Sequence, residues 1–74
     1  MVRKEVDFMY ENLKSLLEQK KITYEQLGSL LNLTPKTVYN KIAGKTEWTL
    51  KEITTIKTFA LPEYDLNYIF ATNT

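Results

Sequence analysis

The residues best suited to chemistry in this 74-residue chain lie together in the segment TPKTVYN, at positions 34–40. Its polar side chains suit the edges of base pairs. A lysine amine donates to guanine O6 and N7, an asparagine amide pairs with adenine, and a threonine methyl meets the methyl of thymine. Lys36, Thr37 and Asn40 are therefore candidate base-reading residues, provided that one helix presents all three on the same side.

Helical geometry predicts that these three side chains share a face. At about 100° per residue, Val38 and Ile42 mark the buried side of a helix over residues 35–42. The three candidates point away from that side, with Tyr39 and Lys41 on its flanks. We therefore expect the candidates to face solvent on a protruding helix.

Three helix starts are predicted from the same local chemistry, in which a threonine side chain caps the first turn. Two of them have the capping-box spacing, and the third has proline at the first helical position, where the missing N–H costs nothing. The pairs are Thr23 with Gln26, Thr34 with Pro35, and Thr49 with Glu52.

Apolar spacing predicts the remaining helices. A first helix over about residues 6–20 would bury Met9, Leu13, Leu16 and Leu17. A fourth would end before Pro62 and bury Leu50, Ile53, Ile56, Phe59 and Ala60. Asp65 would cap a last turn carrying Leu66, Ile69 and Phe70. The expected fold is all-α, a single domain over residues 1–74 with four to five short helices, in which residues 1–5 form a loose arm.

The connection between the second and third helices predicts a helix-turn-helix. Only Asn32, Leu33 and Thr34 separate a helix over residues 24–31 from the helix at 35–42, so the two must cross steeply. Gly28, in the middle of the second helix, is explained if the backbone of the third helix passes close to it. Asn32 suits a left-handed turn conformation.

Composition argues against several classes of function. The chain has no cysteine and no histidine, which removes thiolate metal sites and the commonest general base. It has no nucleophile–base pair and no Gly-rich phosphate loop, so we expect no enzyme, no cofactor and no small-molecule ligand. No apolar run approaches the roughly 20 residues of a membrane span. We expect a cytoplasmic protein with no membrane partner.

Charge is distributed unevenly. Residues 20–45 carry five lysines and one glutamate, a net of +4, whereas residues 47–74 carry two lysines and four acidic residues, a net of −2. A basic middle beside an acidic tail indicates one face that meets an anion.

The stretch ITYEQLGSLLNLTPKTVYNKIAGK resembles the helix-turn-helix of the Cro/repressor family, also called the Xre family, of phage repressors and small bacterial regulators. WTLKEITTIKTFAL and DLNYIF resemble the helices that follow in those domains, and KIAGKTEWTLKEI is similar to short phage-associated regulators. The resemblance covers about residues 8–70. It implies a lambda-repressor-like fold and a transcriptional regulator, a repressor that binds operator DNA as a dimer.

The resemblance and the helix geometry together assign the candidate site. The base-reading set is Thr34, Pro35, Lys36, Thr37 and Asn40. The set expected to contact the DNA backbone is Thr23 and Tyr24 at the start of the second helix, Tyr39 and Lys41 on the flanks of the third, and the loop of Gly44, Lys45 and Thr46. Lys41 stands where most family members have an apolar residue, which predicts a third helix rolled relative to the family's usual pose.

The protein is expected to act as a dimer, and one alternative function remains. One module reads too few bases to select a site, so a two-fold homodimer on a palindromic operator is expected, with Tyr64 and Tyr68 as candidate interface residues. The alternative is a protein-interaction module on the same fold, such as an antitoxin, an antirepressor or a subunit of a larger regulator.

Overall fold

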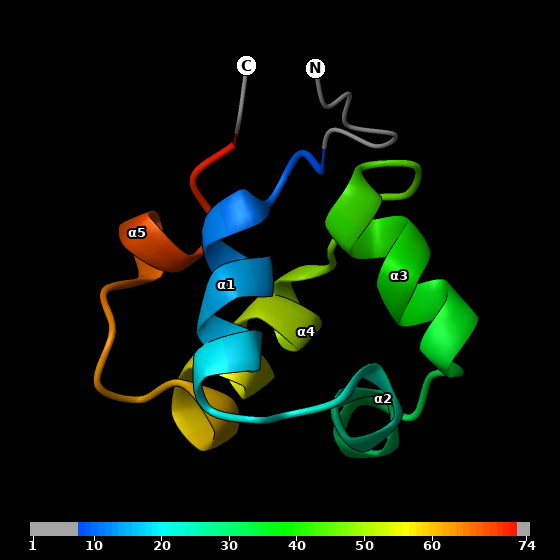
Figure 1. Cartoon of the computed structure of the whole chain (residues 1–74), viewed down its shortest axis with the longest axis horizontal. Coiled ribbons are helices and arrows are strands. Elements are labelled where there is room, and N and C mark those ends of the chain that lie inside the picture. Colours follow the sequence, from blue (N-terminus) through cyan, green and yellow to red (C-terminus); the bar gives the residue numbers. More distant parts are fainter. Residues whose placement is uncertain (1–7, 73–74) are drawn as a thin grey trace, which may run out of the picture.

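The computed structural model describes residues 8–72, which form helices and connecting turns without a β-strand. The elements in chain order are α1 (Glu11–Gln19), α2 (Tyr24–Leu31), α3 (Pro35–Ala43), α4 (Leu50–Thr55), the π-helical turn η1 (Ile56–Ala60) and α5 (Leu66–Ile69). In Figure 1, α1 lies between α3 and α5, and α2 is seen end-on while α3 runs across the view beside it. The expectation of a small all-α domain is confirmed for these residues.

The predicted helix starts are confirmed. The hydroxyls of Thr23 and Thr49 each accept a hydrogen bond from the backbone amide of the third helical residue. The side chain of that residue, Gln26 or Glu52, accepts in turn from the threonine N–H, so both capping boxes form. Thr34 accepts from the Thr37 amide with Pro35 at the first helical position. Asp65 accepts from two amides of α5. Each of these bonds spans two or three residues, and local sequence therefore determines where the helices begin.

The expected first helix is too long at its N-terminal end. α1 begins at Glu11, and the part of the expectation that falls on residues 6 and 7 lies outside the described residues. The Tyr10 N–H donates to the Ile42 carbonyl at 3.1 Å, while the Tyr10 carbonyl accepts from the Lys14 amide, so Tyr10 joins the start of α1 to the end of α3. Met9 precedes the helix, and its side chain packs against Gly44 instead of extending the α1 stripe.

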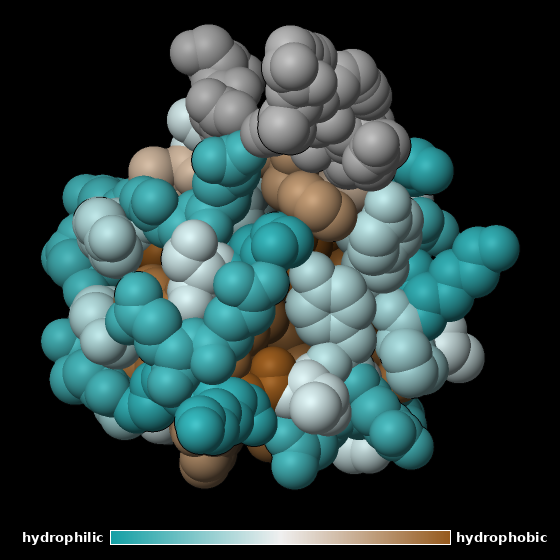
Figure 2. All heavy atoms as spheres, in the orientation of Figure 1, coloured by the Kyte–Doolittle hydropathy of each residue, from teal (hydrophilic) through white to brown (hydrophobic). Residues whose placement is uncertain are grey.

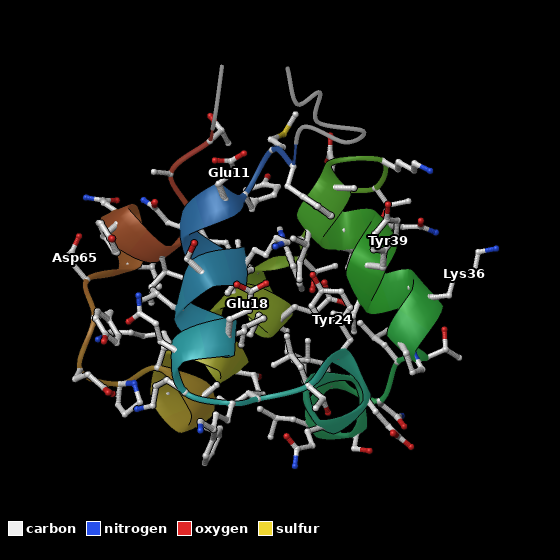
Figure 3. All side chains as sticks on the ribbon, in the orientation of Figure 1. Glu11, Glu18, Tyr24, Lys36, Tyr39 and Asp65 are labelled. Atoms are coloured by element: carbon white, nitrogen blue, oxygen red, sulfur yellow. The ribbon has the colours of Figure 1, made fainter. Side chains whose placement is uncertain are left out.

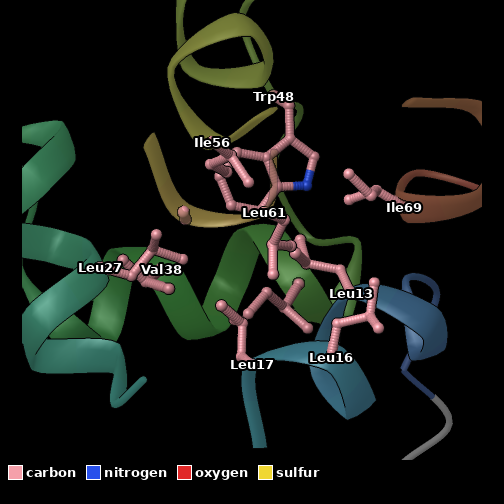
Figure 4. Packing of buried hydrophobic residues seen from close by; sticks show 11 residues of the cluster. Leu13, Leu16, Leu17, Leu27, Val38, Trp48, Ile56, Leu61 and Ile69 are labelled. Carbon is pink, nitrogen blue, oxygen red and sulfur yellow. The ribbon is translucent and has the colours of Figure 1, made fainter. Parts of the chain in front are cut away.

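The hydrophobic core is assembled from every helix except α4, whose only apolar contribution is the partly buried Ile53. Figure 4 shows how the α1 leucines meet Trp48, Ile56, Leu61 and Ile69. The buried apolar residues are Leu13, Leu16, Leu17, Leu27, Val38, Ile42, Trp48, Ile56, Ala60, Leu61 and Ile69. This core fixes α1 as the central support on which α3 and α5 pack.

Two residues expected in the core of the fourth helix are instead exposed. Leu50 is 79% exposed and Phe59 71% exposed. The Leu61 N–H bonds to the Ile56 carbonyl, five residues back, which widens the last turn and brings Ile56, Ala60 and Leu61 to the core while Phe59 turns outward. Leu50 lies about 120° round the helix from Ile56. The prediction that this helix ends before Pro62 is confirmed.

Candidate nucleic-acid interface

The turn between α2 and α3 sets the direction of α3. Asn32 adopts the left-handed conformation, with φ 66° and ψ 41°, as expected. The next amide, of Leu33, donates to the Gly28 carbonyl at 2.7 Å. A Cβ at Gly28 would lie 2.5 Å from the Leu33 carbonyl oxygen. The close approach that requires glycine therefore comes from the turn itself, which corrects the expectation that the backbone of helix α3 crosses there.

The N-terminal end of α3 is the part most open to solvent. Thr34, Pro35 and Lys36 are exposed, and the Lys36 side chain points away from the body of the protein in Figure 3. Thr37 is half-buried, and its hydroxyl lies 2.9 Å from that of Thr34. Asn40 is also half-buried. The expectation that all three predicted base readers face fully outward is thus correct for Lys36 and only partly correct for Thr37 and Asn40.

Lys41 does not lie on an exposed flank of α3. Lys41 is buried, with only 8% of the residue exposed. The ammonium donates to the Glu47 carbonyl at 2.7 Å, lies 3.1 Å from Glu52 Oε1 and sits 5.7 Å from the centre of the Trp48 ring. All of these partners belong to the segment that follows α3. Lys41 is therefore withdrawn from the residues expected to contact a DNA backbone.

Tyr24 and Tyr39 lie beside one another on the face shown in Figure 3, with ring centres 6.5 Å apart. Both are half-buried, and burial raises the pKa of the Tyr24 phenol, with the positive charge of Lys14 opposing it. Sequence reasoning missed Phe8, whose ring packs edge-on against Tyr39 at 5.5 Å. Phe8 falls within the expected first helix over residues 6–20, where its aromatic character was the available signal. The two tyrosines form one aromatic surface with Phe8.

The start of α2 offers less to an anion than expected. The Thr23 N–H donates to Gln26 Oε1 at 2.9 Å, and the Thr23 hydroxyl accepts from the Gln26 amide. The capping box therefore uses the Thr23 N–H, one of the amides that were expected to be free for a phosphate.

The loop after α3 brings two exposed polar residues to the opposite end of the helix. Gly44 has φ +96°, and its amide bonds back to the Asn40 and Lys41 carbonyls. It shapes the turn rather than offering an amide. Lys45 and Thr46 follow it and are exposed, and the Lys45 ammonium lies 5.9 Å from the centre of the Tyr39 ring.

The basic character of the middle segment is smaller in the folded protein than its composition indicates. Lys20 forms an ion pair with Glu63, and Lys41 forms one with Glu52. Within residues 8–72, Lys21, Lys36 and Lys45 are the lysines of this segment that remain to attract an anion. Figure 2 shows that the face carrying α3 is covered largely by hydrophilic side chains.

The residues expected at a dimer interface lie far from α3 in the chain, around α5. Tyr68 is 51% exposed, whereas Tyr64 is half-buried and packs against the core. Their rings stack on one another, with centres 6.4 Å apart. Tyr64 therefore serves the core at least as much as a surface.

Two other kinds of site are absent from residues 8–72. No helix in this part of the chain is long and apolar enough to cross a lipid bilayer. No group of three or more acidic side chains there is placed to hold a metal ion. Comparison of the chain with protein-family models, with curated proteins and with solved structures finds no match.

Proposed function

We propose that this protein binds double-stranded DNA by placing α3 in the major groove, and that it acts as a transcriptional regulator of the Cro/repressor type. The observation that carries the proposal is the left-handed turn at Asn32, which sets α3 across α2 and leaves Thr34, Pro35 and Lys36 exposed at its leading end. An α-helix with its side chains is about 10–12 Å across, so α3 can enter the major groove, which is about 12 Å wide.

Lys36 is the main base-reading residue in this proposal. Thr37 and Asn40, which are half-buried and lie further along α3, make the remaining base contacts. Lys36 is the strongest of the three candidates because it is the exposed one and can donate to both guanine acceptors. Lys45 and Thr46 contact the phosphates beyond the C-terminal end of α3, and Tyr24 and Tyr39 add hydroxyl contacts to the DNA backbone. This division gives specificity to the helix and affinity to its surroundings.

Two copies are needed to select a site, because one α3 covers only a few base pairs. Tyr68 and the exposed Leu66 are the α5 side chains available for pairing. The regulator would then bind a palindromic operator with its two reading helices about one helical turn apart.

Selection from random double-stranded DNA, followed by titration of the selected site at several salt concentrations, tests the proposal. With two or three lysines per copy near phosphates, the slope of log K against log salt should be about −4 to −5 for a dimer. Lys36→Ala and Asn40→Ala should relax base preference while leaving the protein folded. Absence of any selected sequence, or binding without salt dependence, would exclude α3 as a DNA reader.

A second function is supported by the exposed apolar side chains of α4 and η1. Leu50 is 79% exposed and Phe59 is 71% exposed, so each is available as an apolar anchor for a partner protein. They favour a protein-interaction module, in which the helix-turn-helix is only a scaffold. In that case Leu50→Ser and Phe59→Ser would abolish partner binding, and Lys36→Ala would have no effect.

A further inference from the structure

We propose that Lys41 is a positioning residue that sets the rotation of α3 about its own axis, and through it the base preference of Lys36 and Asn40. This inference rests on the proposed DNA-binding function. Lys41 touches no DNA in this proposal. It acts through the partners that hold its ammonium inside the protein.

Lys41 lies on the buried side of its helix. The buried side of α3 consists of Val38, Lys41 and Ile42. At about 100° per residue, Lys36 lies about 140° round the helix from Lys41, close to the opposite side. A rotation that moves Lys41 therefore moves Lys36 by the same angle across the outward face.

The polar contacts of Lys41 are more directional than the apolar contacts on the same side of α3. Val38 and Ile42 pack by shape, and apolar packing tolerates small rotations of a helix. The Lys41 ammonium instead has two polar partners in fixed places, the Glu47 carbonyl at 2.7 Å and Glu52 Oε1 at 3.1 Å. Keeping both partners within reach of the ammonium limits how far α3 can rotate. A buried ion pair with this geometry suits the specification of one register among several.

Glu52, the partner of Lys41 in the ion pair, is itself held in place. Glu52 Oε1 also accepts the Thr49 N–H at 3.0 Å, and the Glu52 amide donates to the Thr49 hydroxyl at 3.1 Å. The carboxylate is thus held by the capping box of α4 and cannot follow α3 if the helix turns. The Trp48 ring covers the lysine from one side. Lys41 therefore connects α3 to the start of α4 at a fixed point.

Lys41 also holds the loop between α3 and α4. The Glu47 carbonyl belongs to the loop that carries Lys45 and Thr46, so the same ammonium also anchors the segment assigned to phosphate contact. Loss of the lysine would release the rotation of the helix and the position of the loop together.

The test compares base preferences of variants selected on random DNA. Lys36→Ala and Asn40→Ala first define which base positions depend on α3. Lys41→Met, which keeps length and removes charge, should then change the preferred bases at those same positions and reduce discrimination there by about 10-fold, within the range of about 5- to 150-fold expected for one good contact.

Glu52→Gln provides a second variant in case Lys41→Met does not fold. A glutamine already completes the capping box of α2, at Gln26, so Glu52→Gln keeps the cap of α4 and removes only the ion pair. It should shift base preference in the same direction as Lys41→Met. The matched control is Lys57→Met, because Lys57 also donates to two backbone carbonyls, at 2.7 Å each, but away from α3.

The result that supports the proposal is a changed base preference in the Lys41 and Glu52 variants and an unchanged one in the Lys57 variant. An unchanged preference in Lys41→Met or in Glu52→Gln overturns it, and so does an equal change in all three, which would indicate general destabilisation. If the wild-type protein selects no DNA, the proposed function fails instead. Amide chemical shifts of Lys36 and Asn40 then decide separately whether the ion pair sets the rotation of α3, by moving in the two variants and not in the control.

Discussion

Replacing Gly28 with alanine tests the turn that orients α3. In an ordinary helix interior this substitution stabilises by about 1 kcal/mol, because alanine has the higher helix propensity. Here the added Cβ would lie 2.5 Å from the Leu33 carbonyl oxygen, a backbone atom that no side-chain rotation can move. The turn would have to move away from α2 to relieve this contact, and that movement would stretch the 2.7 Å hydrogen bond from the Leu33 amide to the Gly28 carbonyl.

The expected sign is therefore opposite to the propensity rule. Overpacking costs about 1–3 kcal/mol and a weakened hydrogen bond about 1 kcal/mol, so after the propensity gain the net loss should be about 1–3 kcal/mol. For a domain of this size each kcal/mol lowers the Tm by about 4–8 °C, which predicts a fall of roughly 4–24 °C. A domain this small has only about 3–5 kcal/mol of stability in total.

Thermal and urea denaturation followed by circular dichroism measure this loss. Ser29→Ala is the matched control, since Ser29 is the exposed neighbour on the same helix and should gain about 0.5 kcal/mol from propensity alone. If Gly28→Ala is as stable as Ser29→Ala, the close contact with the turn does not exist, and the argument for the direction of α3 fails with it.

Three further predictions concern the helix ends and the charged residues. Burial acts to raise the pKa of Glu52, but the hydrogen bond from the Thr49 backbone and the ion pair with Lys41 outweigh it, and the pKa lies below the ordinary value. The ionised carboxylate therefore stabilises the fold above the ordinary glutamate pKa of about 4.3 and loses this effect as the pH falls through the lower, folded-state pKa. Urea denaturation between pH 7 and pH 3 should show less acid sensitivity in Glu52→Gln, and an identical pH profile would contradict the reasoning. Asp65→Ala should cost about 1 kcal/mol of unfolding free energy through loss of the α5 cap, and no loss would show that α5 does not depend on it. Lys45→Ala should make the salt slope of DNA binding less steep by about 0.9 per copy and leave base preference unchanged, whereas a changed preference would place Lys45 at a base.

Much of the fold could be predicted from the sequence because its helix ends are local. Thr23, Thr34, Thr49 and Asp65 cap their helices through bonds to amides two or three residues away. The left-handed Asn32 follows in the same way from its own side chain and from the short connection around it. Interactions over so few residues depend little on the rest of the chain, and residue type and spacing are enough to find them.

The errors have two other causes, a bond to a distant segment of the chain and a departure from regular helical geometry. α1 starts late because the Tyr10 amide bonds to the carbonyl of Ile42. Phe59 is exposed because the last turn of its helix widens, which rotates it away from the position that regular helical spacing predicts. Periodicity assumes a regular helix and gives no information on where a bond from another element interrupts it.

Lys41 shows most clearly where sequence information ends. From helical spacing it lies on a flank of α3, and a lysine there is expected in solvent, since an unpaired ammonium is almost never buried. Only the tertiary structure places Glu52 and the Glu47 carbonyl, from the segment after α3, around that ammonium. Burial of a charge depends on partners that another element supplies, and α3 by itself contains none of them.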